Sequence, residues 1–224
     1  METETEKLNA AKKAITHIEN GMVVGLGSGS TSSLMIMLLG ELVADGLQIN
    51  GVASSLKSEQ LASKLGIPLL PLNQTTTIDI NIDGADEFTE ELQLIKGGGG
   101  ALLREKILAH YSDLNIIITD SSKKSERLGG YPLPLEVIPF AEQKIIKELK
   151  DMGLASNLRM EEGKVYRTDQ ENSILDLDVS NWDDIEALEN LLQAMPGIVE
   201  TGLFLNSTDL VIMGMGNQTF EFKK

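Results

Sequence analysis

The sequence predicts an α/β protein in which a Rossmann-like, mostly parallel sheet domain carries an inserted ferredoxin-like α+β domain. Over the first half of the chain, short apolar runs alternate with helical patterns, as in parallel sheets covered on both faces. The composition changes at Gly129-Gly130-Tyr131-Pro132. Beyond that point the expected order is strand, helix, strand, strand, helix, strand, which is typical of ferredoxin-like domains. We therefore expect residues 1–130 with 207–224 to form the Rossmann-like catalytic domain, and 131–206 the small ferredoxin-like domain.

The first elements are defined by apolar spacing and glycine turns. Leu8, Ala11, Ile15 and Ile18 share one face, which predicts a helix over residues 7–18 that ends at Asn20-Gly21. An apolar strand, 22–26, leads through a Gly-Ser-Gly-Ser-Thr turn into a long apolar helix that reaches residue 43. The expected elements that follow are strand 49–53, helix 58–65, strand 67–72, strand 78–83, a helix from 102 and strand 114–119.

In the small domain the same signals predict a strand over 135–138, a helix over 141–152, strands over 155–160 and 173–179, a helix over 183–195 and a strand over 197–205. Residues 209–213 are apolar and are expected to return to the first sheet as its last strand.

The stretch from Ile78 to Lys106 contains the densest set of chemically useful residues. Ile78, Ile80 and Ile82 alternate with polar residues, so a half-buried strand is expected to end at Gly84. Ligands gather at the carboxyl ends of strands in open α/β sheets. The residues of this stretch that we expect near the strand end are Asp83, Asp86, Lys96, the glycines Gly97, Gly98, Gly99 and Gly100, and Glu105 in the first turns of a helix. Consecutive glycines leave amide N–H groups accessible to an oxyanion.

The Gly27–Thr31 loop has the layout of an anion site. It joins a strand to a helix start, where unpaired N–H groups and the positive helix end attract an anion, and Ser28, Ser30 and Thr31 would add hydroxyl donors. Ordinary N-capping by Ser or Thr explains the same residues equally well. The loop lacks the third glycine of a dinucleotide fingerprint and the Gly-Lys-Ser/Thr of a P-loop.

Composition narrows the possible partners. The 224 residues carry a formal net charge of −15, so neither nucleic acid nor an anionic membrane is expected as a partner. There is no cysteine, and the two histidines, His17 and His110, are far apart in the sequence. Because Lys96 can fill the cationic role among the acidic residues, no metal is expected. The N-terminal segment lacks the apolar core of a signal peptide, so a cytoplasmic protein is expected.

Three motifs identify a family resemblance. DGADE (83–87), KGGGGALLREK (96–106) and GLGSGST (25–31) resemble the signature motifs of type A ribose-5-phosphate isomerases. The resemblance extends over nearly the whole chain, including PLPLEVIPFA at 132–141 and PGIVETGLF at 196–204. Two positions depart from the family pattern: Ser28 stands where Thr is usual, and Gly100 where Ala is common. Both substitutions keep the hydroxyl or the small size.

The resemblance implies an aldose-ketose isomerase of the non-oxidative pentose phosphate pathway that interconverts D-ribose 5-phosphate and D-ribulose 5-phosphate through an enediolate, without a cofactor. Glu105 would be the base and Lys96 would stabilise the oxyanion. Asp83 would exchange protons with sugar hydroxyls, and Asp86 would orient hydroxyls or Lys96. The implied substrate contacts are Lys7, Ser28, Gly29, Ser30, Thr31, Asp83, Gly84, Ala85, Asp86, Lys96, Gly97, Gly98, Gly99 and Lys123. A homodimer, or a tetramer, is also implied.

Three other functions remain as alternatives. An amino-sugar-phosphate deaminase on this scaffold would use a loop histidine, and neither histidine lies in such a loop. A CoA transferase would use a glutamate nucleophile but needs room for a nucleotide. A non-catalytic sugar-phosphate sensor would carry a DNA-binding segment, and nothing basic of that kind is visible in the sequence. Lys7 and Lys123 could also be ordinary solvated lysines.

Overall fold

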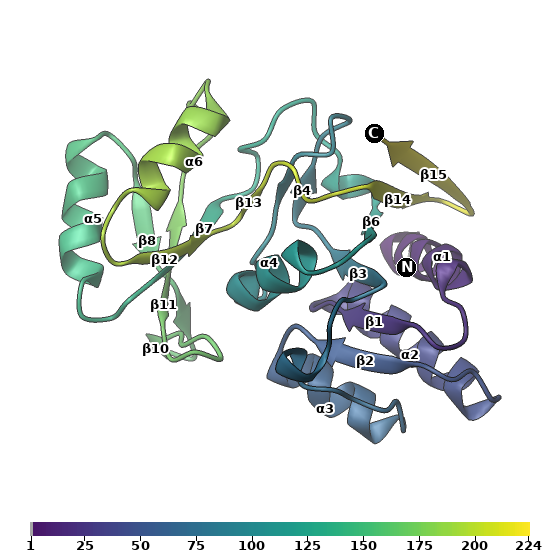
Figure 1. Ribbon diagram of the computed structural model, residues 1–224. Helices are drawn as coiled ribbons and strands as arrows, with labels where there is room; N and C mark the ends of the chain where they lie inside the picture. Colours follow the sequence, from purple (N-terminus) through teal and green to yellow (C-terminus); the bar gives the residue numbers. More distant parts are fainter. Residues whose placement is uncertain (1) are drawn as a thin grey trace.

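The computed structural model describes residues 2–224 and contains two main sheets, which lie side by side in Figure 1. The larger is six-stranded, in the order β15-β14-β6-β3-β1-β2. Its first five strands along the chain are parallel, and only the last is antiparallel to its neighbour. The strands are β1 (Val23–Leu26), β2 (Asn50–Ala53), β3 (Ile80–Gly84), β6 (Asn115–Asp120), β14 (Leu210–Met215) and β15 (Gln218–Lys223).

Both faces of this sheet are covered. On one face, α1 (Glu2–Ala14), α2 (Ser30–Ala44) and α3 (Leu56–Lys64) bury a core that includes Ile116 and Ile118. On the other, Ile117 packs with Ala109 of α4 (Leu102–His110) and with a three-stranded sheet of β4 (Glu87–Phe88), β5 (Leu94–Ile95) and β13 (Leu203–Phe204). This double coverage explains why β6 is buried along its whole length.

The second sheet is antiparallel, in the order β12-β7-β11-β8, and consists of β7 (Leu133–Val137), β8 (Ser156–Leu158), β11 (Ser173–Leu177) and β12 (Ile198–Thr201). With α5 (Glu142–Asp151) and α6 (Ile185–Gln193) it forms the β-α-β-β-α-β order expected from the sequence. A short hairpin of β9 (Met160–Glu161) and β10 (Lys164–Val165) extends from it. The α/β class with a ferredoxin-like unit is confirmed.

The division of the chain into 1–130 with 207–224 and 131–206 is supported by separate apolar cores. Leu135, Leu149 and Leu188 belong to a core built almost wholly from residues of the second segment, whereas Ile80 and Ile116 belong to the core of the first. We propose on this basis that the two segments are distinct domains.

Several expectations about local structure were wrong or incomplete. The expected strand 197–205 divides into β12 and β13, which belong to two different sheets. The expected strand 67–72 is only a single bridge, Gly51 with Leu69, followed by the 3-10 turn η2 (Leu72–Gln74). Pro68 and Pro71 lack the N–H that a ladder requires, which accounts for this. The strand expected to be half buried is instead buried on both faces, with Asn81 and Asp83 only 2% and 1% exposed. β15 was not anticipated.

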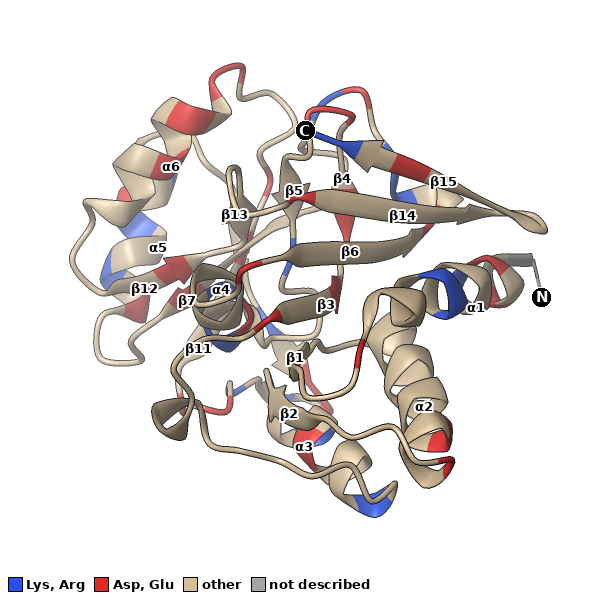
Figure 2. Ribbon diagram, turned by 45° about the vertical axis from the view of Figure 1, so that its right-hand side comes forward, with Lys and Arg blue, Asp and Glu red and all other residues tan. Residues whose placement is uncertain are grey.

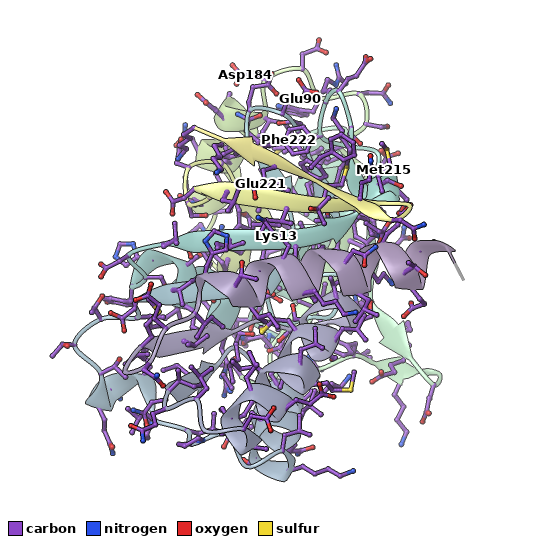
Figure 3. The ribbon with its side chains drawn as sticks, turned by 90° about the vertical axis from the view of Figure 1, so that its right-hand side faces the viewer. Lys13, Glu90, Asp184, Met215, Glu221 and Phe222 are labelled. Atoms are coloured by element: carbon purple, nitrogen blue, oxygen red, sulfur yellow. The ribbon has the colours of Figure 1, made fainter. Side chains whose placement is uncertain are left out.

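The last strand is tied to the first helix. Lys13 of α1 forms an ion pair with Glu221 of β15 at 3.3 Å, and Phe222 meets Phe88 edge to face at 5.5 Å between ring centroids. Figure 3 labels Lys13, Glu221 and Phe222 and shows β15 lying alongside β14 above α1. Both ends of the chain thus pack on the larger sheet. Among residues 2–224, no helix combines the length and apolarity needed to cross a bilayer.

Candidate active site

The site lies where the connections of the larger sheet diverge. From β1 the chain passes to β2 on one side, and it later returns to β3 on the other side of β1. The loops after β1 and β3 therefore leave in opposite directions, and a crevice opens at their carboxyl ends. A cavity of about 130 Å³ fills this position. Its wall consists of Lys7, Ser28, Gly29, Ser30, Thr31, Gly84, Ala85, Asp86, Lys96, Gly97, Gly99, Glu105 and Lys123.

Asp83 lies directly behind the cavity and is fully engaged. Its Oδ1 accepts hydrogen bonds from the amides of Ser28 at 2.9 Å and Gly84 at 2.7 Å, and from the hydroxyl of Ser32 at 3.3 Å. Its Oδ2 lies 3.0 Å from Lys96 Nζ. A carboxylate with this many donors ties the β1–α2 loop to the end of β3.

Lys96 follows β5 and connects the two buried carboxylates. Its Nζ lies 3.0 Å from Asp83 Oδ2 and 3.4 Å from Glu105 Oε2, and it also donates to the carbonyl of Gly84. Burial alone would lower the pKa of Lys96, but the charges of Asp83 and Glu105 outweigh it and raise the pKa above its ordinary value. The ammonium group is therefore kept charged although Lys96 is only 3% exposed.

Glu105 lies in the first turn of α4 and is 5% exposed. Its Oε2 is buried and accepts no hydrogen bond from any described residue, although Lys96 Nζ is 3.4 Å away. Burial, with the negative charge of Asp83 second, raises the pKa of Glu105 to about 8, against the opposing effect of Lys96. A carboxylate with a free oxygen and a raised pKa is well suited to accept a proton from a ligand.

The glycine run is held more tightly than its sequence suggests. The amide of Gly98 donates to Asp86 Oδ2 at 2.7 Å, and the amide of Gly100 closes a turn onto the carbonyl of Gly97 at 2.9 Å. Within residues 2–224, no hydrogen bond engages the amides of Gly97 and Gly99, both of which line the cavity. These two N–H groups are the ones that remain for a ligand.

The Gly27–Thr31 loop leads into α2. Gly29 is the N-cap residue, with φ +91°, and Ser30 and Thr31 begin the helix. Lys7 Nζ donates to Ser30 Oγ at 3.1 Å, and Lys123, from η3 (Ser121–Lys123), lines the same cavity. Two lysines thus meet the positive end of a helix, an arrangement that suits a phosphate.

Ser28 differs from its neighbours in this loop. Its hydroxyl lies within hydrogen-bond distance of Ser54 and Ser55, at 2.8 and 2.7 Å, while its amide is bonded to Asp83. The side chain therefore belongs to a serine cluster behind the loop. The sequence provides no signal for this cluster, because Ser54 and Ser55 follow a different strand.

Two residues that sequence reasoning missed also touch the site. Arg159 and Tyr166 of the second segment donate to carbonyls of the glycine run: Arg159 to Gly97 and Gly98 at 2.9 and 3.0 Å, and Tyr166 to Gly99 at 3.2 Å. Arg159 lies 62 and 61 residues along the chain from the two glycines that it contacts, and Tyr166 lies 67 residues from Gly99. No local motif marks them.

Neither a larger hollow nor the two histidines form a second candidate active site. A larger hollow of about 500 Å³ lies beside Leu103 and Arg104 but is lined mainly by aliphatic side chains. Neither His17 nor His110 lines the smaller cavity. In the part of the chain that the structure describes, no three acidic or histidine side chains form a group that could hold a metal ion. Figure 2 shows acidic residues on helices and loops of both parts of the molecule.

Comparison with known proteins places the chain among enzymes of one kind. Residues 50–218 match the family model described as ribose 5-phosphate isomerase A (phosphoriboisomerase A). A protein of Listeria innocua named ribose-5-phosphate isomerase A is 46% identical over 98% of both chains. A protein of the same name from a Ruegeria species is 45% identical over 97% of this chain and 86% of its own.

Solved structures agree with these sequence relatives. A D-ribose-5-phosphate isomerase in complex with phospho-erythronic acid superposes with a TM-score of 0.96, at 38% identity and with all of both chains covered. The ribose 5-phosphate isomerase A of Methanocaldococcus jannaschii superposes with a TM-score of 0.92, at 38% identity, covering 97% of this chain and 98% of its own.

Proposed function

The chain belongs to the ribose 5-phosphate isomerase A family, and on that premise we propose that it interconverts D-ribose 5-phosphate and D-ribulose 5-phosphate by proton transfer through an enediolate, without a cofactor. The chain is thus an aldose-ketose isomerase. The observation that carries the proposed mechanism is the buried carboxylate of Glu105, whose Oε2 forms an ion pair with Lys96 Nζ at 3.4 Å and accepts no hydrogen bond from any residue that the structure describes.

The reaction requires one base that reaches two adjacent carbons. A proton leaves the carbon beside the carbonyl, an enediolate forms, and the proton returns to the neighbouring carbon. Glu105 fits this role because its free oxygen can take the proton and its pKa of about 8 allows it to give the proton back near neutral pH. Burial, the cause of that raised pKa, also keeps bulk water away from the carboxylate.

The negative charge that develops on the enediolate oxygens requires nearby donors. Lys96 is charged and buried, and Gly97 and Gly99, whose amides donate no hydrogen bond to any described residue, line the same cavity. Removing one well-placed donor of this kind typically costs about 3 to 4 kcal/mol in the barrier. We assign Lys96 and these amides to stabilisation of the oxyanion.

The two aspartates have supporting roles in this mechanism. Asp83 would exchange protons with the sugar hydroxyls, including opening of the furanose ring. Asp86 would orient hydroxyls at the cavity wall, and its carboxylate also holds the amide of Gly98 at 2.7 Å. Asp86 itself lines the cavity, and Asp83 is held behind it by the amide of Gly84, which also lines it; these positions support the two roles.

The phosphate is assigned to the start of α2. Ser30, Thr31, Lys7 and Lys123 surround it, and Gly29 leaves room for an approaching oxygen. A structural relative that holds phospho-erythronic acid supports a phosphorylated ligand of sugar size. Binding energy from the phosphate can then be used to position the reacting end of the sugar.

Wider biological assignments remain predictions. A place in the non-oxidative pentose phosphate pathway follows from the proposed substrate and product. A homodimer and a cytoplasmic location are expected from the family resemblance and from the sequence. Neither nucleic acid nor membrane is proposed as a partner.

The proposed function is tested by incubating the purified protein with ribose 5-phosphate and measuring ribulose 5-phosphate directly. We expect turnover that obeys saturation kinetics, with ribose, which lacks the phosphate, converted far more slowly. Lack of conversion of ribose 5-phosphate would refute the proposal. Formation of a stable acyl adduct with acetyl-CoA, detected by intact mass, would instead favour a CoA transferase.

A further inference from the structure

The glycine run is clamped from outside its own domain. Arg159 follows β8, and its backbone amide donates to the carbonyl of Ile174 at 2.9 Å, so the residue is anchored to the antiparallel sheet. Its guanidinium forms a two-point ion pair with Asp176 of β11. The remaining nitrogen, Nη1, donates to the carbonyls of Gly97 at 2.9 Å and Gly98 at 3.0 Å.

These contacts fix two successive peptide planes. The peptide between Gly97 and Gly98 is held at both ends, because its carbonyl accepts from Arg159 and its N–H donates to Asp86 Oδ2 at 2.7 Å. The next peptide has its carbonyl on Arg159, and no peptide bond in the described residues is cis. In a planar trans peptide the N–H points opposite to the carbonyl, so the amide of Gly99 is turned away from Arg159. Gly99 lines the cavity.

We propose that Arg159, held in place by Asp176, is a positioning residue that turns the amide of Gly99 toward the developing oxyanion of the substrate. The proposal rests on the proposed isomerase function and adds to it a residue from the opposite domain. Arginine suits the task because its rigid fork can hold a carboxylate at two points and still present another N–H to the carbonyls. Tyr166 completes the arrangement by donating to the carbonyl of Gly99 at 3.2 Å.

A positioning role and a purely structural one have different kinetic signatures. If Arg159 orients a donor that acts only on the enediolate, its loss lowers kcat with little change in KM. If it only joins the two domains, its loss lowers thermal stability or changes both constants together. Because Arg159 does not touch Glu105, the pKa seen in the pH profile of kcat/KM should stay where it is in the wild-type enzyme.

Arg127 provides a matched control. Like Arg159, it pairs with a carboxylate, that of Asp183 at 3.0 Å, and donates to backbone, here the single carbonyl of Ser180 at 2.6 Å. It contacts no residue of the glycine run in any interaction of the described chain. Arg127→Met therefore removes a comparable set of interactions, from a more exposed position, without disturbing the site.

The test compares wild type, Arg159→Met and Arg127→Met with ribose 5-phosphate. We expect Arg159→Met to lower kcat by about 10- to 100-fold, less than full loss of an oxyanion donor, with KM within about threefold of wild type. Arg127→Met should stay within about twofold. Guanidinium chloride at a non-denaturing concentration, compared with sodium chloride at equal ionic strength, should restore part of kcat in Arg159→Met only. A wild-type kcat in Arg159→Met, an equal loss in Arg127→Met, or a loss without rescue that appears mainly in KM would overturn the proposal.

Two further measurements test the contact between Arg159 and the glycine run. If Arg159→Met does not fold, Arg159→Lys and Asp176→Asn replace it, and kcat should fall at least about fivefold in each. A lysine cannot hold the carboxylate and both carbonyls, and Asp176→Asn removes the charge that holds Arg159 in place. Amide hydrogen exchange at Gly98 should accelerate at least about tenfold in an Arg159 variant, and unchanged exchange would overturn the clamp itself.

If wild type and Arg127→Met isomerise ribose 5-phosphate and Arg159→Met matches them, the inference fails while the proposed function stands. If wild type shows no turnover, the proposed function fails and the exchange data alone judge the clamp.

Discussion

At the scale of single residues, the site is a balance of three buried charges. With Lys96 beside it, Glu105 still binds its proton more tightly than usual, because burial and then the negative charge of Asp83 raise its pKa to about 8 against the opposing effect of Lys96. The same burial would make an unpaired lysine neutral, but two carboxylates within 3.4 Å keep Lys96 charged. The base is therefore protonated more readily than a free glutamate, and the cation is more firmly charged than a free lysine.

The raised pKa of Glu105 predicts the acid side of the pH profile. A base must be deprotonated to act, so kcat/KM should rise with pH and level off above about 8, the pKa to which burial raises Glu105. The measurement is kcat/KM from pH 5 to 10 at constant ionic strength. A free glutamate would titrate near ~4.3, so a profile that is flat down to pH 5 would contradict the raised pKa.

Lys96 should matter for the chemical step more than for binding. Lys96→Ala removes the cation that we propose stabilises the enediolate, and we expect kcat to fall by about 10²- to 10³-fold. The control is Lys106→Ala, because Lys106 also lies over the ring of Phe204, at 4.9 Å against 5.3 Å for Lys96, and pairs with Glu200 and Glu189 outside the cavity. An effect of Lys96→Ala confined to KM would show that the lysine binds substrate without stabilising the oxyanion.

The residues that could be predicted are those that lie together in the sequence. Asp83, Lys96 and Glu105 fall within one stretch of sequence, and the fold brings Asp83 and Glu105 to within 3.0 and 3.4 Å of Lys96 Nζ. The use of individual amides was not predictable, because hydrogen bonds such as that of Gly98 with Asp86 depend on the exact path of the loop. Arg159 was missed for a different reason: its position depends on how the segment 131–206 packs against the glycine run.

At the scale of elements, the loop between β1 and α2 and the end of β3 form one unit. The amide of Gly27 donates to the carbonyl of Ile82 at 3.0 Å, and a Cβ added at Gly27 would lie 2.5 Å from the backbone Cα of Asp83. The β1–α2 loop can approach the buried Asp83 this closely only because residue 27 is a glycine and has no Cβ. The loop's conformation and the position of Asp83 are thus coupled.

Gly27→Ala should destabilise the fold. The added methyl group meets backbone, which cannot move aside cheaply, so we expect the free energy of unfolding to fall by roughly 1–3 kcal/mol, as for other overpacked sites. Urea denaturation followed by circular dichroism measures it. Gly99→Ala serves as the control for stability, since its Cβ would have no neighbour within 4 Å. Equal midpoints for the two variants would disprove the tight packing.

Most elements followed from local patterns, and the exceptions have physical causes. Helices such as α2 and strands such as β6 are strongly apolar and were placed correctly within a few residues. The segment 67–72 looked like a strand, but its prolines prevent a ladder. β15 alternates aromatic and charged residues over only a short stretch, and its pairing with β14 depends on the tight turn at Gly216.

At the scale of the whole molecule, an acidic protein must attract an anionic substrate. The net charge of −15 repels a sugar phosphate at long range, so attraction has to be local. Lys7, Lys123 and the start of α2 provide it at one end of the cavity, and Lys96 provides it at the other. This distribution of charge matches a ligand with a phosphate at one end and a developing oxyanion at the other.

Catalysis without a metal predicts that removing metals has no effect. Dialysis against a chelator should leave the rate of ribose 5-phosphate isomerisation unchanged, since Lys96 provides the positive charge that a metal would otherwise supply. Activity before and after dialysis is the measurement. A loss that is restored by adding back a divalent cation would contradict the proposed mechanism.

The most direct test of the account follows the proton itself. In D2O, wild type should introduce deuterium at C2 of ribose 5-phosphate, observed by NMR. Glu105→Gln should fold and bind the sugar phosphate but introduce no deuterium over the same period, because it lacks the carboxylate that removes the C2 proton. Exchange at the wild-type rate in Glu105→Gln would contradict the assignment of the base and the mechanism built on it.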